Sequence, residues 1–167
     1  MNKINNEKAM KRSKTQICSA VMKLLETTPY NKLTISQVCS TAGISRPTFY
    51  NNFQSMDAVV HYKLEQMKER YDRKHSYDSD ISLRFADFYS FVKCSKELNL
   101  LIVRNRLFHI FGEQIRDEYL DYIMEHETDT LDEFHRDYLP EYLSATIISL
   151  LQRWMDTGYR ETPEQMA

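Results

Sequence analysis

Apolar positions near the start of the chain recur at the spacing of an amphipathic helix. Four of them fall at positions i, i+4, i+7 and i+8, which places them on one helical face: Ile17, Val21, Leu24 and Leu25. This pattern predicts a helix from about Arg12, preceded by a polar, loose arm over residues 1–10. Pro29 ends the pattern, because the residue before a proline avoids the helical conformation.

Two short helices with a tight turn between them are predicted next. The Thr34 hydroxyl can cap the first while Gln37 reaches back to the cap, and Gly43 ends that helix. Ser45 is a natural cap for the second helix, whose first turn tolerates Pro47. Helix, tight turn and helix in this order predict a helix-turn-helix.

The remainder of the chain also has helical periodicity. A helix is expected from Ser55 to about residue 74, and a second stretch, capped by Ser79 or Asp80, runs to Leu98. An amphipathic helix follows over residues 107–124, and residues 127–130 are expected to form a loop. Pro140 is expected to open the final helix, which Gly158 ends.

The final helix is apolar on nearly all sides, and such a helix needs two buried neighbours. One neighbour is the core of its own chain, and the other is expected to be a second copy. The predicted dimer interface consists of Leu143, Ile147, Ile148, Leu151, Trp154 and Met155.

Composition agrees with an all-α fold. The 167 residues include only three glycines and four prolines, so few breakers interrupt the helical patterns. We expect an N-terminal three-helix domain over residues 1–54 and a helical dimerisation and effector domain over residues 55–167. The sequence shows no signal peptide and no apolar run of membrane-spanning length, so a cytoplasmic protein without membrane contact is expected.

Charge is distributed unevenly along the chain, although the formal net charge is only −2. Residues 1–54 hold eight basic and two acidic groups, whereas residues 55–167 hold 14 basic and 22 acidic groups. A basic first third is suited to a polyanion. The acidic remainder is suited to contact with solvent or with a basic partner. The alternative explanation of the uneven charge is chance variation in surface residues.

The second helix of the predicted helix-turn-helix has the residue types of a DNA-reading helix. Apolar Phe49 and Phe53 brace it from behind, while polar side chains point outward. Arg46 is suited to guanine, and amides are suited to adenine. Phosphate contacts that fix the register are expected from hydroxyl groups. The amides are Asn51 and Asn52, and the hydroxyls are those of Thr48 and Tyr50.

Residues 12–57 resemble the N-terminal domain of the TetR family of transcriptional regulators. The resemblance lies in Leu33-Thr34, Ala42-Gly43-Ile44-Ser45 and the run from Arg46 to Phe53. It implies a homodimer with two DNA-reading heads and a palindromic operator. The residues expected on DNA are Thr34, Ser45, Arg46, Pro47, Thr48, Tyr50, Asn51 and Asn52.

The sequence departs from the family pattern at the start of the fourth helix. Met56 stands where a phosphate-clamping lysine is common. Either that contact is missing, or the basic N-terminal segment, including Lys14, replaces it.

An effector pocket between the later helices is a further expectation. Its candidate residues are aromatic, although aromatic residues more often fill a core: Phe88, Tyr89, Phe108, Phe111, Tyr119 and Tyr122. The function predicted is a dimeric transcriptional repressor whose DNA affinity is controlled through its C-terminal domain, with a small-molecule effector or a protein partner as the expected signal. The alternative is a TetR-fold adaptor or co-activator that signals by protein contacts, without a pocket.

Neither an enzyme nor a cofactor or metal site is expected. The chain has no nucleophile elbow, phosphate loop or zinc-protease motif. Its nearest approach to a metal site, His126 and His135, has a spacing of nine residues that fits no zinc motif.

Overall fold

The computed structural model describes residues 2–73, 81–126 and 132–167, with the side chains of residues 2–6, 81–84, 118, 119 and 121–126 left out. Within these ranges the chain is all-α and contains no strand, as predicted. It divides into two compact units, Met1–Met67 and Lys68–Ala167, called the first and second unit. The division falls inside one helix, α4 (Met56–Asp72).

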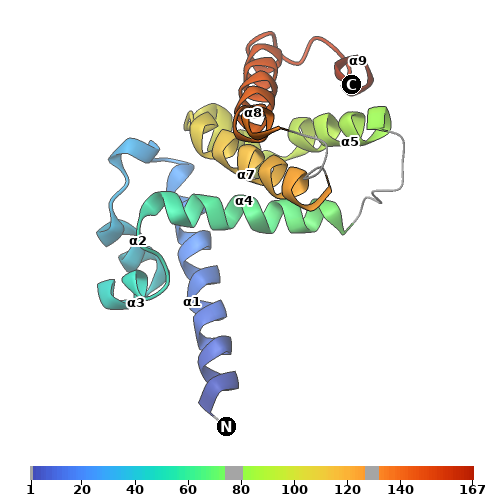
Figure 1. The fold of residues 1–167 in the computed structure, drawn as a ribbon. Helices are drawn as coiled ribbons and strands as arrows, with labels where there is room; N and C mark the ends of the chain where they lie inside the picture. Colours follow the sequence, from blue (N-terminus) through green and yellow to red (C-terminus); the bar gives the residue numbers. More distant parts are fainter. Residues whose placement is uncertain (1, 74–80, 127–131) are drawn as a thin grey trace. The chain divides into compact units, whose positions relative to one another are not determined.

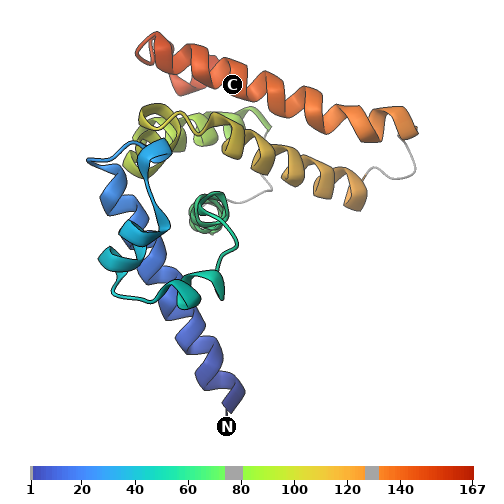
Figure 2. The ribbon, with the colours of Figure 1, turned by 90° about the vertical axis from the view of Figure 1, so that its left-hand side faces the viewer.

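The first unit begins with a helix that is longer than predicted. α1 spans Asn2–Leu25, so the segment expected to be a loose arm is helical. Figures 1 and 2 show that the N-terminal part of α1 extends beyond the other helices of this unit. Residues 2–11 contain neither glycine nor proline, and the good helix formers Glu7, Lys8 and Ala9 lie among them. Extending the helix therefore costs little.

The helix-turn-helix forms as the sequence predicts. After a 3₁₀ turn, η1 (Tyr30–Lys32), come α2 (Ile35–Ala42) and α3 (Arg46–Tyr50). Thr34 and Gln37 make both hydrogen bonds of the capping box on α2, and Ser45 caps α3. The Ser55 hydroxyl accepts a hydrogen bond from the Ala58 amide at 3.1 Å and so caps α4.

Gly43 ends α2 in the left-handed conformation, with φ of +67°. A Cβ added there would meet no atom within 4 Å, so the requirement for glycine is a backbone requirement. We expect Gly43→Ala to lower the free energy of unfolding of the first unit by about 1–2 kcal/mol, the cost of an L-residue in this region. Denaturant unfolding measures this loss. An unchanged midpoint would show that the turn relaxes to another conformation.

The second unit contains the remaining helices. They are α5 (Ile81–Cys94), α6 (Lys96–Leu98), the π-helical η2 (Asn99–Arg104), α7 (Phe108–His126), α8 (Glu133–Asp156) and α9 (Pro163–Met166). α7 lies beside α8, and α9 packs against α5. The stretch expected to run unbroken to Leu98 is interrupted at Ser95, whose hydroxyl caps α6.

Pro140 does not open the final helix, contrary to the prediction. α8 already begins at Glu133, where the Asp132 carboxylate accepts a hydrogen bond from the His135 amide at 2.9 Å. Pro140 lies buried in the helix interior. A proline there removes one hydrogen bond, so packing of α8 must offset that loss. The loop expected over residues 127–130 lies outside the described residues.

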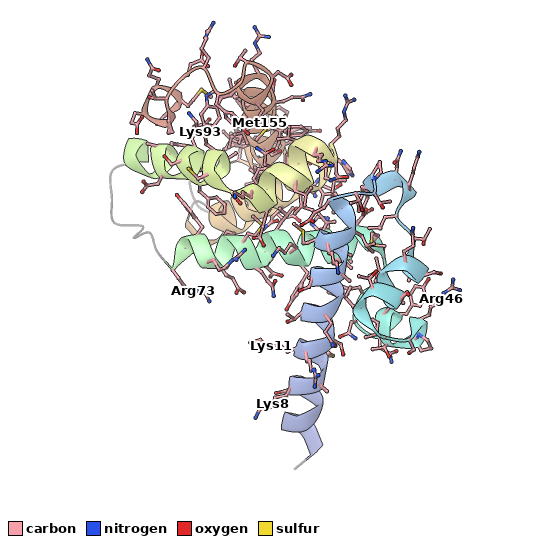
Figure 3. The ribbon with its side chains drawn as sticks, turned by 180° about the vertical axis from the view of Figure 1, so that it is seen from behind. Lys8, Lys11, Arg46, Arg73, Lys93 and Met155 are labelled. Carbon is pink, nitrogen blue, oxygen red and sulfur yellow. The ribbon has the colours of Figure 1, made fainter. Side chains whose placement is uncertain are left out.

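The core of the second unit is built around the indole ring of Trp154. The ring meets Tyr89 and Tyr159 edge to face, at centroid distances of 5.4 and 5.0 Å. Its Nε1 donates a hydrogen bond to the Glu161 carbonyl oxygen at 2.9 Å. The Lys93 ammonium lies 5.7 Å from the ring centroid, and Figure 3 shows Lys93 on α5. These contacts connect α5 and α8 with the C-terminal segment.

Two cysteines belong to the apolar core of the first unit. Cys18 and Cys39 are buried in the first unit. Burial raises the pKa of the Cys18 thiol to about 11, so this group is neutral at physiological pH and is a poor nucleophile. In the described residues, no helix is both long and apolar enough to cross a membrane.

Candidate DNA-binding surface

α3 has one buried and one exposed side. Phe49 is fully buried, and its ring packs against Phe53 at a centroid distance of 6.2 Å. The neighbouring Tyr50 is 55% exposed. Arg46, Pro47 and Asn51 are also exposed on α3 and at its end. A short helix therefore offers polar side chains to a ligand while two aromatic rings fix it from behind.

Arg46 reaches from α3 to α2. Its Nη2 donates a hydrogen bond to the Ser36 hydroxyl, and the guanidinium remains exposed. In Figure 3, Arg46 lies at the outer edge of the helix-turn-helix. Ser36 was not among the residues expected at this surface. Its position in the first turn of α2, the helix that precedes α3, could have indicated that Ser36 lies at this surface.

Two of the hydroxyls predicted on DNA already have structural roles. The Thr34 Oγ1 accepts a hydrogen bond from the Gln37 amide, and the Ser45 Oγ accepts one from the Thr48 amide at 3.2 Å. The Ser45 and Thr48 hydroxyls are 2.8 Å apart and bond to each other. Both caps are exposed, so they fix the first turns of α2 and α3 at the surface.

The two neighbouring amides at the end of α3 are arranged differently. Asn51 is exposed, whereas Asn52 is half-buried and its Nδ2 donates a hydrogen bond to the Thr48 carbonyl oxygen at 2.7 Å. This hydrogen bond engages the side-chain amide of Asn52 within the helix-turn-helix. Asn51 is therefore the amide with more freedom to meet a base.

Lys14 is held against aromatic rings of its own unit. Its ammonium lies 4.8 Å from the Tyr62 ring centroid and 5.6 Å from that of Phe53. At such distances the charge is attracted to the ring faces. Lys14 thus joins α1 to α4. Lys8 and Lys11 are exposed on the extending part of α1, as Figure 3 shows. The neighbouring Arg12 is exposed as well.

The start of α4 is fixed to η1. The Tyr30 hydroxyl donates a hydrogen bond to the Asp57 carboxylate, and burial together with this carboxylate raises the pKa of the phenol. Met56, in the first turn of α4, is half-buried. The role of Tyr30 was not predicted, because nothing in its local pattern indicated a partner 27 residues away.

Comparison with known families agrees with this architecture. Residues 17–62 match the model described as bacterial regulatory proteins of the tetR family, and residues 95–167 match that of a transcriptional regulator C-terminal region. The chain belongs to the TetR family of transcriptional regulators. A solved structure of the dihydroxyacetone kinase operon activator DhaS has a similar fold. Its TM-score is 0.50, its sequence identity is 18%, and the match covers 92% of this chain and 89% of that one. No curated protein sequence matches the chain.

In this TetR-family regulator, the aromatic residues predicted to line an effector pocket are packed to different extents. Tyr89 and Phe111 are buried, and Phe88 and Phe108 are half-buried. The Tyr89 ring meets both the Phe88 ring and the Trp154 indole edge to face. Tyr119 and Tyr122 belong to α7, but their side chains lie outside those described. The described side chains therefore form part of a packed core, and the pocket stays a prediction.

The residues predicted to form a dimer interface are also distributed over different sides of α8. Leu151, Trp154 and Met155 are buried within the regulator, while Leu143, Ile147 and Ile148 are half-buried. A separate face of α8 is open and has a shallow depression lined by Tyr142, Ala145, Thr146, Ser149 and Leu150. Among the described residues, no cluster of three metal-ligating side chains could hold an ion.

Proposed function

We propose that this regulator is a homodimer that reads a palindromic operator through α3 and represses transcription from it. The single observation that supports this most strongly is the division of α3 into a buried aromatic side and an exposed polar side. An element of this form enters the major groove in helix-turn-helix proteins. The net basic charge of residues 1–54 supports the same surface.

The proposed roles follow the exposure of the side chains. Arg46, held from one side by Ser36, reads guanine by donating to O6 and N7. Tyr50 and Pro47 contact the backbone, and Asn51 reads adenine or binds phosphate. Thr34 and Ser45 cap α2 and α3, and these caps fix the orientation of the two helices on the duplex. Lys8, Lys11 and Arg12 add charge that attracts DNA.

Two copies of α3 would enter successive major grooves about 34–36 Å apart, which requires an operator of two inverted half-sites. Control is proposed to act through the second unit. An effector with a few kcal/mol of differential affinity for two states of that unit is sufficient to shift operator occupancy strongly.

The test is selection of bound duplexes from a random pool, with the wild type and with Arg46→Ala. We expect the wild type to return a palindrome. Arg46→Ala should weaken binding to it by about 1–3 kcal/mol and relax the base preference at one position in each half-site.

A control variant, Lys23→Ala, removes an exposed cation from the other end of α1 and should select the same sequence. If Arg46→Ala binds more weakly but selects an unchanged sequence, Arg46 is a phosphate contact. If the wild type selects no sequence, the proposed function is wrong.

A second candidate function is regulation by a protein partner rather than by a small molecule. The ring contacts of Tyr89 with Phe88 and Trp154 favour it, because a side chain that is engaged in core contacts is less free to line a cavity. Titration with an apolar fluorescent probe such as anilinonaphthalene sulfonate discriminates the two. One saturable site that Phe111→Trp removes would favour a small-molecule pocket, and its absence would favour a protein partner.

A further inference from the structure

We infer that Ser36 determines which base Arg46 reads. The Ser36 hydroxyl holds the guanidinium in one orientation and donates its own proton to the DNA beside it. Ser36 is a positioning residue in the first of these roles, because it acts through Arg46, and a DNA contact in the second. The inference rests on the proposed function, because it requires α3 to read an operator.

The two side chains come from different helices and meet at the surface. Ser36 lies in the first turn of α2, and Arg46 is the first residue of α3. The Arg46 Nη2 donates a hydrogen bond to the Ser36 Oγ across ten residues of the chain. Both residues are exposed, so this bond lies where the helix-turn-helix can meet a ligand.

Both ends of the bond belong to backbone that is fixed by local hydrogen bonds. Thr34 and Gln37 bond to each other in the capping box that encloses Ser36. The Ser45 side chain caps α3 immediately before Arg46. The long arginine side chain is therefore the flexible part of the arrangement. Holding it before DNA arrives reduces the rotamer freedom that binding would otherwise remove.

A hydroxyl orients a guanidinium without neutralising its charge. Two other exposed arginines of the chain pair with carboxylates instead, Arg70 with Glu97 and Arg160 with Glu161, each at 2.6 Å. In such pairs the positive charge is already compensated. Arg46 donates to a neutral partner, and its charge stays available to attract the phosphates of a duplex.

The donors that remain on Arg46 fit one guanine. Arginine has five N–H donors, and the bond to Ser36 engages one of the two on Nη2. The others include pairs that can donate to O6 and N7 of guanine. Because the Ser36 Oγ occupies one side of the guanidinium, Arg46 can turn a free edge to fewer bases than an unrestrained arginine. The bond thus restricts recognition to one base position in each half-site.

The Ser36 hydroxyl supplies a donor of its own. A serine hydroxyl has one proton and two lone pairs, and one lone pair accepts from Arg46. Repulsion from the cationic donor directs the hydroxyl proton away from the guanidinium. On a duplex, that proton is placed to bond a phosphate oxygen, the type of acceptor that most protein donors meet on DNA. Ser36 and Arg46 therefore form one joint set of donors.

Binding to single-base variants of the selected operator tests this role. We expect Ser36→Ala to lower the affinity for the intact operator by about twofold to tenfold, the effect of one hydrogen bond. Discrimination between guanine and the other bases should fall at the position that Arg46→Ala also relaxes, and at no other position. Ser36→Thr retains a hydroxyl and should restore this discrimination.

Three controls separate positioning from folding. Because Ser36 is exposed, the unfolding midpoint of Ser36→Ala should equal that of the wild type. Ser40→Ala removes an exposed hydroxyl one turn further along α2 and should leave affinity and base preference unchanged. In an Arg46→Ala background, Ser36→Ala should cause no further loss of discrimination, because the group that Ser36 orients is absent.

The outcomes separate this inference from the proposed function. Lost discrimination at the Arg46 position, with unchanged stability and with recovery in Ser36→Thr, supports the inference. Full discrimination by Ser36→Ala would overturn it, while a palindrome selected by the wild type would leave the proposed function intact. An Arg46→Ala variant with unchanged base preference would also overturn it, because Arg46 would then contact phosphate. A wild type that selects no sequence would overturn both.

Discussion

Trp154→Ala is expected to lower the free energy of unfolding of the second unit by about 3–5 kcal/mol, the range found for buried large-to-small substitutions. The indole is only 1% exposed, and its removal deletes the edge-to-face contacts that it makes with Tyr89 and Tyr159. The hydrogen bond from Nε1 to the Glu161 carbonyl is lost as well. Because the total stability of a domain is about 5–15 kcal/mol, such a loss would bring the unit close to unfolding.

Urea unfolding followed by circular dichroism measures this change. The matched control is Tyr142→Ala, which truncates a ring that is 68% exposed on the same helix and should change monomer stability by less than about 0.5 kcal/mol. The sequence alone suggested that altering Trp154 would separate two subunits. Because the ring is buried, we expect Trp154→Ala to unfold the second unit rather than to separate two folded subunits. A stably folded monomer of Trp154→Ala would place the ring in the interface instead.

Phe49→Ala is expected to have a comparable effect on the first unit. Its ring is fully buried and contacts both Phe53 and Tyr50. We expect a loss of about 3–5 kcal/mol in stability and, as a consequence, loss of DNA binding. The physical reason is that α3 has only five residues, and a helix of this length depends on packing for its stability.

The neighbouring residue provides the control that separates folding from recognition. Tyr50→Ala removes an exposed ring and should leave the unfolding midpoint nearly unchanged while DNA affinity falls. Unfolding curves and binding isotherms of the two variants should therefore diverge. Equal loss of stability in both would show that Tyr50 belongs to the core, and undiminished DNA binding by Tyr50→Ala would remove it from the proposed surface.

Features that depend on a few neighbouring residues could be predicted from the sequence. The capping box of Thr34 and Gln37, the left-handed Gly43 and the Ser45 cap are set by local hydrogen bonds and backbone preferences, and the structure confirms each. The buried Phe49 and exposed Tyr50 follow from helical periodicity in the same way.

Features that depend on tertiary packing could not be predicted. Pro140 is a helix breaker by its local preference, yet burial of α8 retains it inside the helix. Lys14 was expected on DNA because of its charge, but it lies over the rings of Phe53 and Tyr62, one of them 48 residues away in the chain. Tyr89, the ring on α5 that meets Trp154, is 65 residues away from it in the chain. Such contacts are set by the arrangement of helices and leave no local pattern.

Two copies of α3 are proposed to read two inverted half-sites. Comparing the affinity for an intact site with the affinity for a site in which one half is scrambled tests this proposal directly. The duplex selected from the random pool and a version with one half-site scrambled should be compared at about 50 mM and about 200 mM salt. We predict that the intact palindrome binds more tightly by a factor of about 10³ or more, and that both affinities fall steeply with salt. Equal affinity for the two duplexes at both salt concentrations would contradict the account.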